Sequence, residues 1–227
     1  MHTTSPFLLP NAAILLAFAA FLFANAIIAE DGNFKSQRIV MTRIAAPWYA
    51  PKFLVKGKMK DSIPEYKQID GLKNKFYSME TTSKLFGGIY LFESQKQAEA
   101  WFNASWYDRI EKKYNHTEKF PILKPIFLFT NPQLATASQT DSFQAEVFHF
   151  TAKDKKNLEA EIKSFLDSFQ KDPSVEAIWF AEDSNSNSYF LYVVQNTKEE
   201  RTIPTEFLKN VELKERFTTE IPFGIFR

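Results

Sequence analysis

The chain has 227 residues, with 28 lysines and arginines against 27 aspartates and glutamates, so its formal net charge at pH 7 is +1. The basic residues are scattered along the sequence, which argues against a nucleic-acid partner. Cysteine is absent, so disulfides, iron–sulfur clusters, thiolate metal sites and cysteine nucleophiles are excluded. Three histidines and six glycines leave little material for a histidine-rich metal centre or a phosphate-binding glycine loop.

The first 29 residues are typical of an export signal. Residues 12–24 form an unbroken apolar run, and Ala24-Asn25-Ala26 provides a small-x-small cleavage site. Residues 1–11 contain no lysine or arginine, so an uncleaved anchor formed by residues 12–29 is the alternative. We therefore expect an exported protein, periplasmic or secreted, or one that associates with a membrane through residues 12–29.

After this leader, the first structured segment covers residues 38–130. We expect strands at 38–46, 72–80, 88–93 and 121–130, a mixed helix and loop at 51–69, and a helix from Ser94 to about Tyr114. Ser94 and Gln97 form a capping box at the start of that helix. The prolines of residues 121–130 predict that this strand lies at the edge of a sheet.

A polar linker at residues 131–141 leads to a second segment, residues 142–227, with the same order of elements. We expect strands at 143–150, 175–181, 189–195 and 216–226, and a weak helical stretch at 199–213. Thr151 and Asp154 can cap a helix between the first two of these strands. Its apolar residues keep helical spacing, at Leu158, Ile162, Phe165 and Phe169.

The central strands of both segments are apolar on both faces. Ile89 and Leu91 alternate with Tyr90 and Phe92, and residues 189–195 show the same two-sided pattern. A ferredoxin-like sheet that is covered by helices on one side would leave its other side in water. We therefore predict an α+β fold in which two tandem ferredoxin-like (βαββαβ) halves pack sheet to sheet within one chain.

Residues 38–130 resemble the dimeric α+β barrel superfamily, and within it the putative monooxygenase group related to the antibiotic-biosynthesis monooxygenases. The residues that carry this resemblance are Asp70-Gly71-Leu72, Gly87-Gly88-Ile89-Tyr90-Leu91-Phe92 and the segment from Ser94 to Trp101. Family members usually build their barrel from two chains, so this chain resembles a fused pair, an intramolecular pseudo-dimer. The resemblance implies cofactor-free oxygenation of a small aromatic or quinol-type substrate.

Haem handling, another activity of the family, is disfavoured. In the haem-degrading branch a helix tryptophan, which Trp101 would match, is joined by a histidine about three turns later and by an asparagine on the first strand. Here Glu111 stands ten residues after Trp101, and residues 38–46 contain no asparagine. His116 is the nearest histidine, and we expect it to lie beyond the end of the helix.

Two residues are predicted to be catalytic. His149 lies in a strand and faces away from Phe148 and Phe150, so a neutral imidazole there could serve as a general base near pH 7. Arg43 could pair with a carboxylate or phenolate of the substrate. The alternatives are a hydrogen-bonded sheet histidine and a salt-bridged arginine.

An aromatic wall is predicted for a planar, hydrophobic substrate. Its candidate residues are Trp101, Tyr90, Tyr77, Trp106 and Trp48. Core packing is the alternative for Trp101 and Trp106, because large aromatic residues at helical spacing commonly fill cores. For Tyr77 and Tyr90 the alternative is that tyrosine is favoured in strands, and for Trp48 it is simple loop exposure. A non-catalytic envelope protein that binds a hydrophobic small molecule is therefore the alternative function.

Overall fold

The computed structural model describes residues 34–136, 143–153, 155–197 and 210–227, which all belong to one compact unit, Gly32–Arg227. These residues form an α+β fold. Its elements are β1 (Arg38–Ala45), α2 (Lys52–Tyr66), β2 (Leu72–Glu80), β3 (Leu85–Phe92), α3 (Gln95–Trp101), α4 (Ala104–Tyr114), β4 (Ile122–Thr130), the 3-10 helix η1 (Pro132–Thr136), β5 (Phe143–Ala152), α5 (Lys155–Gln170), β6 (Val175–Asp183), β7 (Ser188–Gln195), β8 (Val211–Ile221) and β9 (Gly224–Phe226).

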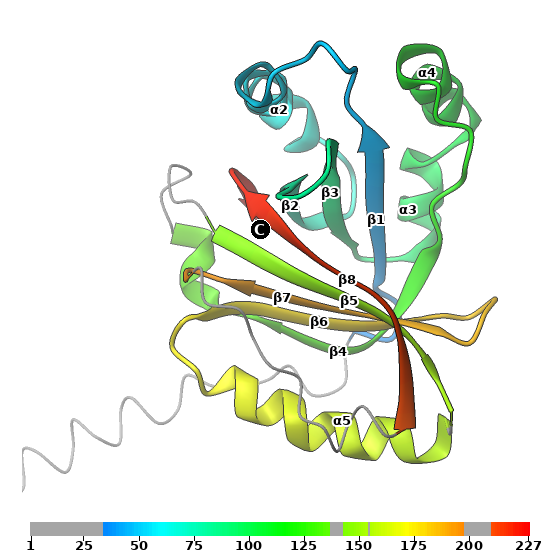
Figure 1. Cartoon of the computed structure of the whole chain (residues 1–227), viewed down its shortest axis with the longest axis vertical. Helices are drawn as coiled ribbons and strands as arrows, with labels where there is room; N and C mark the ends of the chain where they lie inside the picture. Colours follow the sequence, from blue (N-terminus) through cyan, green and yellow to red (C-terminus); the bar gives the residue numbers. More distant parts are fainter. Residues whose placement is uncertain (1–33, 137–142, 154, 198–209) are drawn as a thin grey trace, which may run out of the picture. The chain divides into compact units, whose positions relative to one another are not determined.

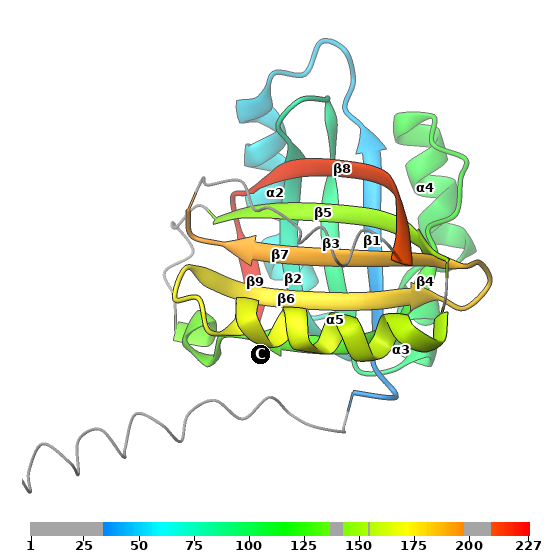
Figure 2. The same ribbon diagram turned by 60° about the horizontal axis from the view of Figure 1, so that its bottom comes forward.

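The described strands pair in one antiparallel sheet that closes on itself. Their order is β3-β1-β4-β6-β7-β5-β8-β2-β9, and β2 also pairs with β3, which completes a ring of eight strands. Strands β5 to β8 cross β1 to β3, as Figure 2 shows. The order within the first part of the chain is β4-β1-β3-β2, and within the second part it is β6-β7-β5-β8.

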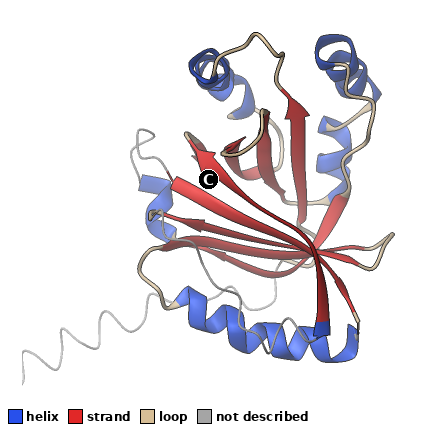
Figure 3. Cartoon of the chain, viewed as in Figure 1, coloured by secondary structure: helices blue, strands red, loops and turns tan. Residues whose placement is uncertain are grey.

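Helices cover the ring from outside. In Figure 1, α2, α3 and α4 lie on the far side of β1 to β3 from the other strands, and α5 lies outside β4 to β7. Figure 3 shows no described helix between the two groups of strands. The interior is therefore filled mainly by strand side chains, among them Ile39, Phe76, Val147, Trp179 and Tyr192, together with Leu134 of η1.

The two-sided burial predicted for β3 is confirmed. Ile89 and Leu91 belong to the interior cluster, whereas Tyr90 and Phe92 pack with residues of α3 and α4 on the outer face. Strand β7 behaves in the same way, because Tyr192 and Val194 face the interior while Leu191 packs beneath α5. Burial on both faces is the physical reason that these strands carry no polar alternation.

The single helix predicted from Ser94 to Tyr114 is in fact two helices, α3 and α4. Ser94 caps α3 as predicted, since its Oγ accepts a hydrogen bond from the Gln97 amide at 3.3 Å. The helix then stops at Phe102, and the Asn103 Oδ1 accepts a hydrogen bond from the Trp106 amide at 3.0 Å. Asn103 therefore starts α4 as a second N-cap, in a position where asparagine is strongly favoured.

The prediction of an edge strand at residues 121–130 was wrong. Strand β4 pairs with β1 through Ile122 and Leu123 and with β6 from Lys124 onward. Pro125 is tolerated because it lies at an irregularity in the register, between Pro125 and Phe127, where a strand can do without one amide donor.

Three further boundaries differ from the prediction. Strand β3 begins at Leu85, three residues early, and Thr151 belongs to β5 and pairs with Ser188, so it is no helix cap. Residues 211–213 open strand β8 instead of ending a helix. The leader, Asp154 and residues 199–209 lie outside the described residues, as do residues 137–141 of the predicted linker. No helix of the described part of the chain is both long and apolar enough to cross a membrane.

Candidate functional site

A cavity of about 500 Å³ opens at the end of β1, within the size range of small-molecule pockets. Four strands and one connecting segment enclose it. The lining residues are Met41, Arg43 and Ala45 of β1, Leu85 of β3, residues 115–121 between α4 and β4, Leu123 of β4, and Phe190 and Tyr192 of β7.

The alternation of the strands brings these side chains together. On β1, the odd-numbered residues Met41 and Arg43 face the interior, while Val40 and Ile44 pack under the helices. The segment that follows α4 is turned toward the cavity by Asn115, which caps the helix in the left-handed conformation with φ of 54°. Asparagine tolerates that conformation better than most residues do.

Arg43 is the charged centre of the site. Its Nη1 and Nη2 donate to the two carboxylate oxygens of Glu215, each at 2.9 Å, and its Nε donates to Glu80 at 2.6 Å. Its guanidinium also lies 4.0 Å from the centre of the Phe217 ring. Burial by itself would lower the pKa of Arg43, but its hydrogen bonds to Glu215 and Glu80 raise it, so the group keeps its positive charge.

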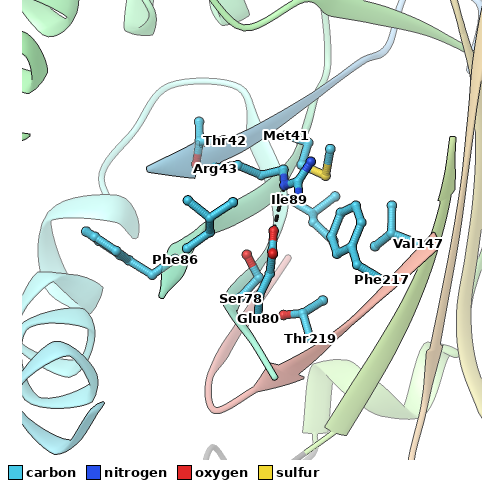
Figure 4. Close-up of a pocket in the computed structure, with 11 residues that line it drawn as sticks. Met41, Thr42, Arg43, Ser78, Glu80, Phe86, Ile89, Val147, Phe217 and Thr219 are labelled. Carbon is cyan, nitrogen blue, oxygen red and sulfur yellow. Dashed lines mark hydrogen bonds and ion pairs between the residues drawn. The ribbon is translucent and has the colours of Figure 1, made fainter. Parts of the chain in front are cut away.

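Beside Arg43 lies a second, very small space of about 10 Å³, on the scale of one water molecule. Figure 4 shows its lining, with Met41 and Arg43 from β1 pointing toward Phe217 and Glu80. Met41, Arg43 and Leu85 line both spaces and therefore form the wall between them. The main cavity is the one large enough for an organic molecule.

Two polar groups of the cavity wall have no hydrogen-bond partner among the described residues. They are the Tyr192 hydroxyl and the His116 Nε2, and both atoms are buried. Buried polar atoms in native proteins almost always have partners, so an exception needs an explanation. A ligand with an oxygen or nitrogen near these atoms would satisfy both. Burial also raises the pKa of Tyr192, so its hydroxyl stays a proton donor.

The structure brings His149 close to Arg43 without placing it on the cavity wall. His149 pairs with Phe190 on β7 and with Glu215 on β8, and its ring stacks on Phe190 with 4.5 Å between centroids. Its Nε2 is buried and has no partner among the described residues. Burial lowers the pKa of His149, Glu215 opposes this and Arg43 reinforces it, so the imidazole is neutral near pH 7.

The aromatic residues predicted to line the pocket lie elsewhere. Tyr77, Tyr90 and Trp106 are buried on the helix-covered face of the sheet, outside the ring, and Trp101 packs against them through Tyr66. The exposed fraction of Trp48 is 83%, so this residue lies at the surface. The predicted catalytic pair is thus gathered near the cavity, and the predicted aromatic wall is not.

The residues expected of a haem-degrading site do not come together either. Glu111 is exposed on α4, and Trp101 lies outside the ring, whereas His116 lines the cavity. In the described part of the chain, no group of three or more histidine, aspartate or glutamate side chains is arranged to hold a metal ion.

Sequence reasoning missed Tyr192, Phe190 and Glu215. The alternation of β7 indicated that Phe190 and Tyr192 share one face. The sequence did not indicate that this face lines the same cavity as β1. The role of Glu215 could not be predicted from local sequence, because its ion pair with Arg43 joins residues 172 positions apart.

No protein-family model and no curated protein matches the sequence, but solved structures do. A putative monooxygenase from Lactobacillus acidophilus is 14% identical with a TM-score of 0.56, covering 82% of this chain and 93% of its own. One from Fusobacterium nucleatum is 11% identical with a TM-score of 0.67, at 86% and 96% coverage. An anthrone oxidase-like protein is 9% identical with a TM-score of 0.56, at 87% and 95%.

The resemblance predicted from the sequence is confirmed at the level of the fold. The chain has the mixed α+β fold of these structures. Identities this low establish the fold alone.

Proposed function

We propose that the protein is a monooxygenase-like enzyme that oxidises a small hydroxyaromatic or quinol-type molecule with O₂, without a cofactor, in the cavity at the end of β1. The observation that carries this proposal is a cavity of about 500 Å³ whose strand walls are mainly apolar and carry Arg43 and the unpartnered hydroxyl donor of Tyr192. Such a site suits a planar molecule with a single oxygen that becomes negatively charged.

Arg43 and Tyr192 would bind that oxygen. A phenolate or enolate is the electron-rich form that reacts with O₂, and positioned donors in a dry site stabilise such an anion. Arg43 is already paired with two carboxylates, so its charge attracts the anion only in part, and the Tyr192 hydroxyl supplies the direct hydrogen bond. A phenol with a free para carbon plus one O₂ then gives the para-quinone plus one water.

His116 would accept the proton of the substrate. It lines the cavity, and its buried Nε2 has no hydrogen-bond partner among the described residues. His149, the base predicted from the sequence, is neutral near pH 7. Its ring stacks on Phe190, which lines the cavity and so stands between His149 and a substrate. It remains the second proposed base, since its Nε2 would reach a substrate if the Phe190 ring turned aside.

We also propose that the chain is a fused pair of ferredoxin-like halves, and that it is exported or anchored by its leader. The strand orders β4-β1-β3-β2 and β6-β7-β5-β8 support the first point, because each follows the ferredoxin-like pattern and the two meet at β4–β6 and β2–β8. The apolar residues 12–29 support the second. Fractionation of the source cells with mass measurement of the recovered chain tests both the cleavage and the location.

Oxygen uptake with a panel of hydroxyaromatics, anthrone among them, tests the activity. We expect uptake of one O₂ per quinone formed. Tyr192→Phe, which removes one oxygen atom, should lower kcat/KM by about tenfold to a hundredfold. Tyr189→Phe is the matched control, because Tyr189 lies on the same strand but packs beneath α5. A protein that neither consumes O₂ nor binds any member of the panel would overturn the proposal.

The same panel separates the alternative function. Binding of a hydroxyaromatic that depends on Tyr192, with no O₂ consumed, would indicate a non-catalytic module that carries a hydrophobic small molecule. His116→Ala and His149→Ala distinguish the two proposed bases. The variant that lacks the true base should lose most activity near neutral pH and regain it at high pH, where the substrate phenol ionises without a base.

A further inference from the structure

Four large hydrophobic side chains are exposed within seven consecutive residues. The exposed fractions are 83% for Trp48, 70% for Tyr49, 71% for Phe53 and 53% for Leu54. Among the described residues, one other large hydrophobic side chain, Leu213 on β8, is exposed to a comparable degree. Scattered exposed apolar residues are ordinary, but a contiguous group of this kind marks an interaction surface.

Lysines surround this group. Residues 47–60 contain Lys52, Lys56, Lys58 and Lys60 and no aspartate or glutamate. A fifth lysine, Lys84 from the turn between β2 and β3, donates to the Trp48 carbonyl at 3.1 Å.

Two carboxylates partly offset these five charges. Glu220 pairs with Lys52 and Lys56, and Asp61 lies 3.8 Å from Lys58. The surface therefore keeps an excess of positive charge, although the whole chain is nearly neutral.

The surface projects from the molecule at the end of β1 that borders the cavity. Ala45, the last residue of β1, lines the cavity, and Trp48 follows three residues later. In Figures 1 and 2 the segment between β1 and α2 reaches beyond the strands at the same end. An object bound there would contact the protein next to the cavity entrance.

We propose that this surface, residues 47–60 with Lys84, docks on an anionic lipid bilayer. Tryptophan and tyrosine rings are suited to the boundary between headgroups and acyl chains, because each has an apolar body and a polar tip. Lysines beside them attract anionic headgroups. A protein partner with an acidic face would match the charges too, and failure of the protein to bind vesicles would favour it.

The test uses the full chain with vesicles of phosphatidylglycerol and phosphatidylcholine in which the phosphatidylcholine acyl chains carry bromine, a contact quencher of tryptophan fluorescence. Trp48 is the exposed tryptophan, since Trp106 and Trp179 are buried and Trp101 is half-buried. We expect part of the fluorescence to be quenched, and we expect Trp48→Phe to lose that part.

Variants separate the surface from the apolar leader, which stays unchanged in all of them. Phe53→Ala combined with Lys58→Glu and Lys60→Glu should reduce quenching to the level of Trp48→Phe. Leu213→Ala removes an exposed apolar side chain elsewhere, and Lys112→Glu with Lys113→Glu reverses two exposed charges on α4. Both control variants should keep the quenching of the unaltered protein.

Three results would overturn the proposal. The first is equal quenching of the unaltered protein and Trp48→Phe, which means that Trp48 does not enter the bilayer. The second is undiminished quenching in vesicles of phosphatidylcholine alone, because anionic lipid would then play no part. The third is protection of Trp48 from a soluble quencher that depends on protein concentration in the absence of vesicles, which would assign the surface to a second copy of the chain.

Discussion

Arg43 and Glu215 form a two-point ion pair across the interior of the ring, with Nη1 to Oε2 and Nη2 to Oε1 distances of 2.9 Å. Arg43 is on β1 and Glu215 on β8, and β2 and β3 separate these strands in the sheet. The pair therefore connects the two crossing groups of strands through their side chains. The same guanidinium belongs to the cavity wall, so the charge that we propose for substrate binding also holds the site together.

Replacement of Arg43 should destabilise the protein through Glu80. The Glu80 side chain is only 7% exposed and would keep Ser83 as its remaining hydrogen-bond partner. We expect Arg43→Met to lower the free energy of unfolding by about 2–3 kcal/mol, because a buried carboxylate would lose its counter-charge. Urea unfolding measures this. Adding Glu80→Gln should recover part of the loss, and a double variant as unstable as the sum of the single variants would contradict the explanation.

Removal of the Tyr192 hydroxyl should raise the stability of the ligand-free protein but weaken ligand binding. In the ligand-free protein this buried hydroxyl has no partner among the described residues. We therefore expect Tyr192→Phe to unfold at higher urea concentration, with a gain of about 1 kcal/mol, while it weakens ligand binding. Unfolding curves with and without a bound hydroxyaromatic measure both effects. A loss of stability without ligand would mean that the hydroxyl already has a partner.

The sequence predicted those parts of the fold that local pattern determines. Strand β2 was predicted with its observed bounds, and the two-sided pattern of Ile89 to Phe92 correctly required burial on both faces. The break between α3 and α4 at Asn103 was not predicted, because the apolar residues keep helical spacing across it. Asparagine is a favoured N-cap residue, so Asn103 was the available signal. Pro125 led to the wrong prediction of an edge strand, because a proline can also lie at an irregularity in the register inside a sheet.

The site was less predictable because it depends on long-range register. Arg43 could be selected as a charged residue on an apolar strand, but its partners are set by how β1, β2 and β8 meet inside the ring. Tyr90 and Trp101 fit an aromatic pocket by residue type. Successive side chains of a strand point to opposite faces, however, and Tyr90 points to the outer face while its neighbours Ile89 and Leu91 point to the interior. The aromatic residues in contact with the cavity are instead Phe190 and Tyr192, far along the chain, and Phe120 from the segment between α4 and β4.

Gly87 should be intolerant of any side chain. It pairs with Arg43 in the β1–β3 ladder, and a Cβ there would run into the Thr42 carbonyl oxygen of the neighbouring strand. We expect Gly87→Ala to cost about 2 kcal/mol or more, because backbone must move to admit the methyl group. Gly57→Ala is the matched control: nothing lies near its added Cβ within α2, so a gain of about 0.5–1 kcal/mol is expected. Equal effects in thermal unfolding would contradict the steric argument.

Lys75 should make stability rise with pH. Its side chain is buried on the outer face, and its amine lies 2.9 Å from the ring centre of Tyr66 and 3.8 Å from that of Tyr77. Burial holds the pKa of Lys75 well below that of a free lysine, with a small opposing effect of Glu65. Between the folded and unfolded pKa values the unfolded chain carries one more proton, so the free energy of unfolding rises with pH there by up to about 1.4 kcal/mol per unit.

Buried tyrosines set the pH above which the free energy of unfolding stops rising. Burial raises the pKa of Tyr77 and Tyr90, and their contribution is present below the pKa of an unfolded tyrosine and lost as the pH rises above it. We therefore expect Lys75→Met to be more stable than the unaltered protein at pH 7 and to lose the increase between pH 7 and about 9.5. Urea unfolding across this range measures the difference, with Lys73→Met on the same strand as the control. An unchanged slope in Lys75→Met would mean that the ring faces hold Lys75 as an ammonium ion, since a cation–π attraction favours the charged form.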